Sequence, residues 1–163
     1  MSTHVFKVVV SGGSFYHSCR PCLPREYVVQ YWRGHESVAL PGTKLFCFYS
    51  EYYARMWGRQ YYWPFDGEGV TIWRAEATGV VPTRGRSLPH LDDTVVIEEW
   101  WRRTLALPQT SFKNLWPQYE EYDRWLNEHS GFPHNMPQEY PVGTVWADTI
   151  TLLHNITPER QAA

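Results

Sequence analysis

The first residues that could do chemistry in this chain are two closely spaced cysteines. Cys19 and Cys22 are separated by two residues, and His17 precedes Cys19 by two. Two thiolates at this spacing can hold one Zn²⁺, and His17 with Cys47 would complete four ligands. The same CxxC can also be a redox pair or two ordinary thiols. A structural zinc site usually shows a second paired half-site, and this sequence has none. Zinc binding is therefore not assigned, and the three interpretations stay open.

The other residue types with catalytic potential are scattered. The seven His form no HxH, HxxxH or HExxH pair, and no Ser lies in a GxSxG motif. The acidic pairs are neighbours in the sequence, so their side chains point apart on a strand or helix. These pairs are Asp92-Asp93, Glu98-Glu99 and Glu120-Glu121. We therefore assign no catalytic residue, no metal ligand and no cofactor, and we expect a protein that is not an enzyme.

Arginine and aromatic residues, in contrast, recur together. Aromatic faces stack nucleobases, and the planar guanidinium of Arg binds phosphate through two parallel hydrogen bonds. Arg can also lie over an aromatic ring through an ordinary cation–π contact, without any ligand. Taken together, the groups favour a nucleotide or another small anionic ligand. They are Trp32-Arg33, Arg55/Trp57/Arg59, Trp73-Arg74, Arg84/Arg86 and Trp100-Trp101-Arg102-Arg103.

Composition limits the class of protein. The chain has 163 residues with 43% hydrophobic and 20% charged residues, which is ordinary for a globular domain. Its net charge of −2 argues against a surface for duplex nucleic acid, which needs a basic excess. No apolar stretch reaches the ~18–20 residues of a membrane span. The first residues lack a signal-peptide pattern, so we expect a cytoplasmic protein without a membrane partner.

The aromatic content is high. Aromatic residues make up 17% of the chain, with nine Trp and eleven Tyr. Trp and Tyr combine a large apolar area with a polar group, so they concentrate at interfaces and at surfaces that stack ligands as well as in cores. Part of this content is therefore expected outside the core.

Strand-like and helix-like segments alternate irregularly along the chain. Apolar and β-branched runs predict strands over residues 5–10, 15–19, 26–32, 44–49, 70–77 and 143–153. Helical spacing predicts helices over 50–60, with Ser50 as N-cap, and over 115–128, while 94–107 is a strand end or a short helix. This order predicts an α+β fold, with an antiparallel or mixed sheet of about five to six strands and two main helices packed on it. We expect one domain over 1–157 and a flexible tail over 158–163.

Three segments resemble a known group of proteins. They are PGTKLFCFYSEYYARMWG from residue 41, GVTIWRAEATG from 69 and PVGTVWADTITLL from 141. With Phe6-Lys7-Val8-Val9 they are similar to small uncharacterised α+β proteins of bacteriophages and their hosts. The matching positions cover about half of the chain: Gly42 to Phe48, Ala54, Trp73 with Glu76, and Gly143 to Asp148.

Within that group, the layout resembles the phage sponge proteins that counter Thoeris-type immunity. The resemblance implies a small oligomer that sequesters cyclic ADP-ribose-like signals or cyclic oligonucleotides. A similar strand–helix–strand core occurs in the ADP-ribosyltransferase-like fold, but here the last strand offers Asp148 where that family has Glu, and Ser-Thr-Ser is missing. A viral structural or host-protein-binding module that uses the Trp-rich surface is the third alternative.

We therefore expect a non-enzymatic, oligomeric anti-defence protein in the cytoplasm of an infected host cell, which captures a nucleotide-derived immune signal. Sequestration needs a tight, enclosing pocket and no general base. The predicted stacking residues are Trp57, Phe65 and Trp73. The predicted phosphate contacts are Arg55, Arg84 and Arg86.

Overall fold

The computed structural model describes residues 1–10, 13–14, 24–62, 70–85, 87–89, 93–108, 116–129 and 138–157. The chain divides into two compact units. The sheet unit consists of Met1–His17, Val28–Pro82 and Pro141–Ala163, and the helical unit of Ser18–Tyr27 and Thr83–Tyr140. The single domain expected over residues 1–157 stays a prediction, and the tail at 158–163 lies outside the described residues.

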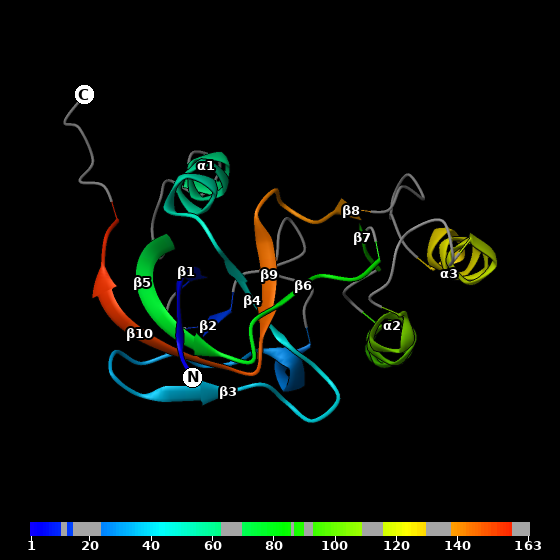
Figure 1. The fold of residues 1–163 in the computed structure, drawn as a ribbon, viewed down its shortest axis with the longest axis horizontal. Coiled ribbons are helices and arrows are strands. Elements are labelled where there is room, and N and C mark those ends of the chain that lie inside the picture. The colour runs from blue at the N-terminus through cyan, green and yellow to red at the C-terminus, as the bar shows by residue number, and fades with distance from the viewer. Residues whose placement is uncertain are drawn as a thin grey trace. The chain divides into compact units, whose positions relative to one another are not determined.

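The fold has the predicted α+β class, and the strand pairings among the described residues are all antiparallel. The main strands of the sheet unit are β1 (Thr3–Val10), β4 (Leu45–Phe48), β5 (Val70–Thr78), β9 (Thr144–Ala147) and β10 (Thr149–Asn155). Three short strands join them: β2 (Gly13–Ser14), β3 (Glu36–Val38) and β6 (Val81–Pro82). The order is β3-β10-β5-β1-β4-β9-β6, and β2 pairs with β1 (Figure 1). α1 (Glu51–Tyr62) is the helix of this unit.

The helical unit contains α2 (Thr94–Ala106) and α3 (Trp116–Glu128). A 3₁₀ helix, η2 (Arg25–Tyr27), and the short pair β7 (Ser87–Leu88) and β8 (Gln138–Glu139) accompany them. The described residues thus hold three α-helices and more strands than the five to six expected. The additional strands are two or three residues long, and such short strands leave no periodic pattern in a sequence.

Most of the longer elements lie where the sequence places them. The strands expected over 5–10, 44–49 and 70–77 are confirmed as β1, β4 and β5, and the two expected helices as α1 and α3. β4 and β5 are not neighbours, because β1 lies between them. The strand expected over 15–19 lies outside the described residues.

Two expected strands are wrong as stated. Residues 25–27 form η2, where the amide of Tyr27 donates to the carbonyl of Pro24 at 3.0 Å. Pro24 has a fixed φ that suits the start of a turn, and this local bond replaces the expected extended ladder. The single strand expected over 143–153 is broken into β9 and β10 at Asp148.

The break at Asp148 lets two consecutive strands pair on opposite sides of β1 in the same sheet. β9 pairs with β4, while β10, which begins one residue after β9 ends, pairs with β5 on the far side of β1. β6 follows β5 after two residues and pairs with β9. Two continuous ribbons, β5–β6 and β9–β10, therefore run together around a strongly curled sheet (Figure 1).

Close backbone contacts fix the bend. The amide of Asp148 donates to the carbonyl of Thr78 at 2.8 Å, and the amide of Ala39 donates to the carbonyl of Asp148 at 2.8 Å. The Asp148 carboxylate pairs with the Lys44 ammonium at 2.5 Å. Gly79 has φ +62°, and a Cβ at this position would overlap the Asp148 carboxylate. Only a glycine fits both the backbone conformation and the space at this point.

The two faces of the curled sheet bury different residues. The inner face is lined mainly by aliphatic and small side chains: Val5, Val9, Tyr31, Leu45, Cys47, Ala75, Ala77, Ala147, Ile150 and Leu152. The outer face packs Val8, Phe48, Val70 and Ile72 against Ala54 and Trp57 of α1. The three alanines of the inner face suit a concave surface, where facing side chains have little room.

Lys7 is the buried charged residue of the inner face. Its side chain is 2% exposed, and its Nζ donates to the carbonyl of Phe46 at 2.5 Å and lies 5.0 Å from the centre of the Tyr31 ring. Strand alternation places Lys7 on the same face as Val5 and Val9. Burial lowers the pKa of the Lys7 ammonium from 10.5 to about 8, because removal from water disfavours the charged form.

We predict that Gly79→Ala destabilises the protein by about 2–4 kcal/mol, from the strained backbone and the overlap with Asp148. Gly42→Ala is the matched control, since Gly42 also has a positive φ, +76°, but a Cβ there meets nothing within 4 Å. Its expected cost is about 1 kcal/mol, from the backbone alone. Urea unfolding measures both, and equal costs would contradict the steric role of Asp148.

We also predict a pH dependence of stability from Lys7. Its pKa is about 8 in the folded chain and 10.5 as the ordinary value, so the unfolded chain binds more protons in this window. The free energy of unfolding should therefore rise by about 1 kcal/mol between pH 7 and pH 9. Lys7→Met should abolish this rise.

The comparison is made by urea unfolding in a Cys47→Ala background. This background is needed because burial raises the pKa of the Cys47 thiol from 9.0 to about 12. The unfolded chain therefore loses the thiol proton first, which lowers stability as the pH approaches and passes 9. If Lys7→Met keeps the same rise of stability with pH, the rise does not come from a lowered pKa of Lys7.

Candidate functional site

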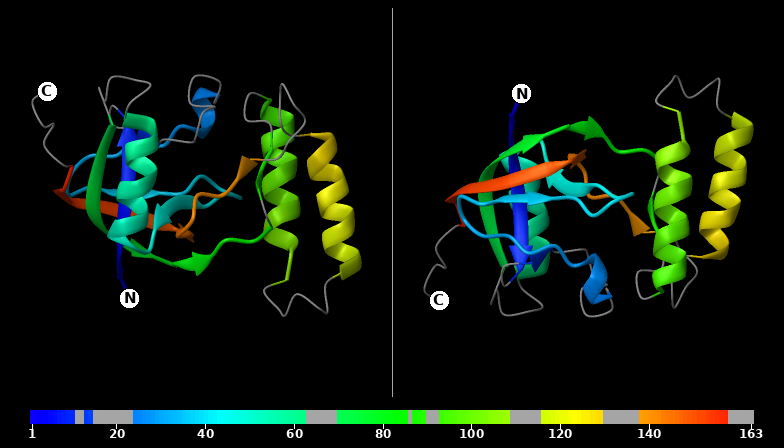
Figure 2. Two further views of the ribbon diagram at one scale, coloured as in Figure 1. Left: turned by 90° about the horizontal axis from the view of Figure 1, so that it is seen from above. Right: turned by 90° about the horizontal axis from the view of Figure 1, so that it is seen from below.

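The two helices of the helical unit begin and pack for reasons visible in the sequence. Asp93 caps α2, accepting hydrogen bonds from the amides of Val95 at 2.9 Å and Val96 at 3.3 Å. One face of α2 is buried at helical spacing, through Ile97, Trp100, Trp101 and Thr104. Tyr122 and Leu126 form the buried face of α3. α2 and α3 lie side by side (Figure 2).

A buried hydrogen bond joins the two helices. The hydroxyls of Thr104 and Tyr122 are 2.8 Å apart, and both residues are almost fully buried. Burial is the main reason that the pKa of Tyr122 is raised to about 12, so its hydroxyl stays protonated and can donate. Gly85 lies against the same ring, because a Cβ there would be 2.7 Å from the Tyr122 hydroxyl oxygen. The orientation of Tyr122 is therefore set from two sides.

Arg84 closes the C-terminal end of α2. Its Nη1 donates to the carbonyls of Leu105 at 2.6 Å and Leu107 at 3.1 Å. These carbonyls are among the last of the helix, which have no amide partner within it, and a positive charge also suits this end of the helix dipole. The carbonyl of Arg84 accepts a hydrogen bond from the Tyr140 hydroxyl at 2.7 Å. The end of α2 is thus held in one position.

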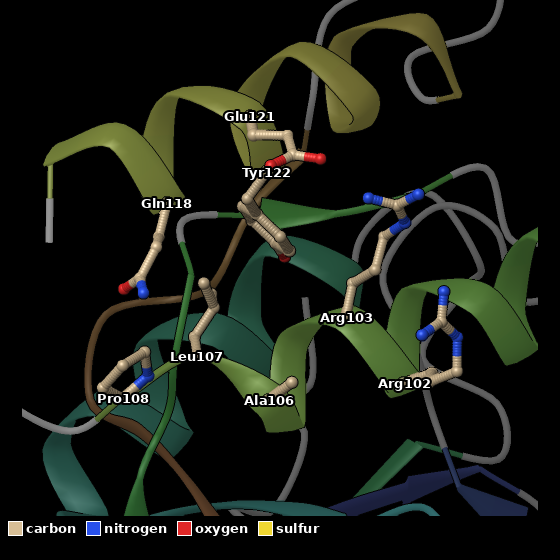
Figure 3. A pocket seen from close by; sticks show the side chains of 8 residues that line it. All are labelled: Arg102, Arg103, Ala106, Leu107, Pro108, Gln118, Glu121 and Tyr122. Atoms are coloured by element: carbon tan, nitrogen blue, oxygen red, sulfur yellow. The ribbon is translucent and has the colours of Figure 1, made fainter.

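A pocket of about 400 Å³ opens where the end of α2 faces α3. Figure 3 shows Arg102, Arg103 and Leu107 on the α2 side, with Gln118, Glu121 and Tyr122 extending toward them from α3. Ala106 and Pro108 complete the lining. The pocket therefore combines two guanidinium groups, one carboxylate, one amide and an apolar wall.

Glu99 orients both arginines. Arg102 donates to it through Nε at 2.9 Å and through Nη2 at 2.5 Å, and Arg103 donates through Nε at 2.7 Å. These hydrogen bonds, first that of Arg102, hold the pKa of Glu99 at about 2, so Glu99 is ionised at neutral pH. Both guanidinium groups are thus placed at the pocket by one carboxylate one turn earlier in the helix.

An aromatic column extends from Arg103. The guanidinium carbon lies 5.1 Å from the centre of the Trp125 ring, and Trp125 stacks on His129 at 4.7 Å with an interplanar angle of 16°. The His129 Nδ1 is 2.7 Å from the carbonyl of Trp125. Cation–π contact and hydrogen bonding therefore both restrict the Arg103 side chain.

Three of the six predicted ligand residues lie in the sheet unit. Arg55 pairs with Glu51 one turn earlier, at 3.1 Å. Trp57 is 8% exposed and packs against Phe48 in the outer-face core. Trp73 packs against the inner-face core, and its Nε1 donates to the Thr71 hydroxyl at 2.9 Å. Trp57 and Trp73 are thus on opposite faces of the sheet.

The other three predicted ligand residues divide differently. Arg84 is in the helical unit, where it caps α2, and Phe65 and Arg86 lie outside the described residues. No group of three or more metal-ligating side chains occurs in the part of the chain that the structure describes. Cys19, Cys22 and His17 fall outside that part, and Cys47 is a buried free thiol.

Asp148 has a structural position. This residue stands where an ADP-ribosyltransferase-like strand would carry its Glu. In the structure its carboxylate pairs with Lys44 and its backbone holds the bend between β9 and β10. The ADP-ribosyltransferase-like alternative stays a prediction.

The pocket residues from α3 were missed by the sequence analysis. Arg102 and Arg103 were noted as one of the Arg–aromatic groups, but Gln118, Glu121 and Tyr122 were not connected with them. The available signal was the pair of basic residues in the last turns of a helix that ends before Pro108, followed by a second amphipathic helix. Which residues face each other across the two helices depends on tertiary packing.

Comparisons with known proteins give no family for this chain. Neither the scan against protein-family models, nor the search of curated proteins, nor the search of solved structures finds a match. None of the helices in the described ranges is both long enough and apolar enough to cross a membrane. The site is therefore interpreted from its own chemistry.

Proposed function

We propose that this protein is a non-enzymatic binding protein that sequesters a nucleotide-derived signal in the pocket between α2 and α3. The ligand class is a cyclic ADP-ribose-like molecule or a cyclic oligonucleotide, and the biological role is anti-defence in an infected host cell. The observation that carries the proposal is the composition of one pocket, in which two guanidinium groups, a carboxylate and an apolar wall lie together.

The mixed lining favours a nucleotide over a simple anion. A phosphate can be bound by the guanidinium groups of Arg102 and Arg103, which offer donors in a planar arrangement. Ribose hydroxyls donate well to a carboxylate such as that of Glu121. A base needs an apolar surface, and Leu107, Pro108 and Tyr122 line the same pocket. A simple anion would use only the first of these three features.

The size and the rigidity of the pocket also suit capture. A volume of about 400 Å³ lies within the ~300–1,000 Å³ range of small-molecule sites. Glu99, Trp125, Arg84 and the Thr104–Tyr122 hydrogen bond hold the walls before a ligand arrives. A preformed site loses little conformational entropy on binding, which favours tight association. Sequestration requires this property and no catalytic group.

The function is tested by ligand recovery. The protein is incubated with cyclic ADP-ribose or a cyclic dinucleotide, separated from unbound ligand and heated, and the released molecule is identified by mass spectrometry. Intact ligand supports sequestration. A chemically altered ligand would indicate an enzyme, and no uptake of either probe would contradict the proposal.

We predict that Arg103→Ala weakens nucleotide binding at least tenfold, because one charge-assisted phosphate contact contributes roughly 1.5–3 kcal/mol. Arg124→Ala is the matched control, an exposed arginine on α3 outside the pocket lining, and should change affinity less than twofold. Isothermal titration calorimetry measures both affinities, and thermal unfolding confirms that both variants are folded.

A second variant separates loss of charge from loss of space. Gln118 lines the pocket from the exposed side of α3, so Gln118→Trp should fill the pocket and block binding without changing its charge. Equal affinities of wild type, Arg103→Ala and Gln118→Trp would show that the ligand binds elsewhere.

A further inference from the structure

The outer face of α1 carries exposed aromatic residues that the proposed function does not use. Tyr49, Tyr52 and Met56 are 58%, 66% and 44% exposed. Tyr53 contacts both tyrosines: the centre of its ring is 5.6 Å from that of Tyr49 and 5.5 Å from that of Tyr52. These four residues are here called the tyrosine patch. Tyr52 and Met56 lie opposite the buried side of α1, which Ala54, Trp57 and Gly58 form, and Tyr53 is half-buried against the outer-face core.

The tyrosine patch is preorganised. Both Tyr–Tyr contacts are edge-to-face, with interplanar angles of 67°, and a hydrogen bond to Tyr53 is the main cause of a raised pKa of Tyr49. Gly143 supports the Tyr53 ring from behind, since a Cβ there would be 2.5 Å from it, and the neighbouring Val142 is 70% exposed. Tyr and Met are enriched in protein interfaces, and rings already held in place lose little entropy on binding.

We propose that the tyrosine patch is an interface with a second copy of this chain, formed by two antiparallel α1 helices around a two-fold axis. The charges that flank the patch favour a second copy as the partner. Glu51 and Arg55 lie on one side of the exposed face, one turn apart, and are both half-buried.

A two-fold axis places each flank of the helix against the same flank of its partner, in the reverse direction. A crossing near Tyr53 and Ala54 therefore sets Glu51 of one copy opposite Arg55 of the other, twice. The same crossing sets Tyr52 of one copy against Met56 of the other. The flank that carries Glu51 and Arg55 is thus complementary in charge to the same flank of an antiparallel second copy.

The interface is expected to be small. α1 has 12 residues and is therefore roughly 18 Å long, so one face of this helix buries less than the ~800 Å² per partner of a standard interface. We expect a dimer that dissociates in the micromolar range, so its formation should depend on protein concentration.

Sedimentation velocity of the full chain between 1 and 100 µM tests the interface. The wild type should shift from monomer to dimer. Tyr52→Glu or Met56→Glu should remain monomeric, because a buried unpaired charge lowers the dimer affinity at least 30-fold. Val95→Glu is the control, because Val95 is 74% exposed on α2 of the helical unit and does not belong to the patch, and this variant should dimerise like the wild type. Circular dichroism confirms that all variants are folded.

Charge exchange tests the geometry. A Glu51→Arg chain has two basic residues on the flank, and an Arg55→Glu chain has two acidic ones. Each alone should be monomeric, whereas an equimolar mixture should form a heterodimer, because both trans pairs are then complementary. A monomeric wild type at 100 µM, a dimeric Tyr52→Glu variant or a mixture without heterodimer would each overturn the proposal. None of these results depends on nucleotide binding.

Discussion

The bend at Gly79 and Asp148 is the constraint on which the sheet unit depends. At this point β5 continues into β6 and β9 into β10. The pair β5–β10 lies on one side of β1 and β4, and the pair β6–β9 lies on the other. The Asp148 amide bonds to Thr78, its carbonyl accepts from Ala39, and its carboxylate takes the space that a side chain at Gly79 would fill. The tight curl that results explains why the inner face holds Ala75, Ala77 and Ala147, and why Lys7, one residue in an apolar row, is removed from water.

Polar contacts fix the end of α2 and the position of α3 against it in the helical unit. Arg84 supplies the carbonyls at the end of α2 with donors, and the Thr104–Tyr122 hydrogen bond sets α3 against α2. Glu99 then directs two arginines toward the opening that remains. Because Glu99 and both arginines belong to the same helix, the positive groups of the pocket are fixed by local structure, and α3 adds the carboxylate, the amide and the ring. This division suits a ligand that carries a phosphate at one end and a sugar or base at the other.

The sequence predicted local structure better than the site. The strand at β1, the strand–helix pair β4–α1 and the alternation of β5 follow from residue type and period, and all are present. The kink at Asp148 was not predicted. Residues 143–153 are rich in apolar and β-branched residues, and the break depends on contacts with Ala39, Thr78 and Gly79, which are distant in sequence. Trp57 and Trp73 show why the site was harder to predict than the fold. Both residue types suit ligand stacking, but the phase of α1 and the alternation of β5 direct their side chains into two different core clusters. Arg84 was predicted to bind a phosphate, but in the structure its guanidinium donates to the carbonyls at the end of α2.

Hydrogen–deuterium exchange with and without cyclic ADP-ribose locates a bound ligand on the protein without prior choice of a residue. Binding in the pocket between α2 and α3 predicts slower amide exchange over residues 100–108 and 118–126, which frame the pocket, and unchanged exchange over β1 and β5. Protection confined to the sheet unit, or equal exchange in both samples at saturating ligand, would contradict it.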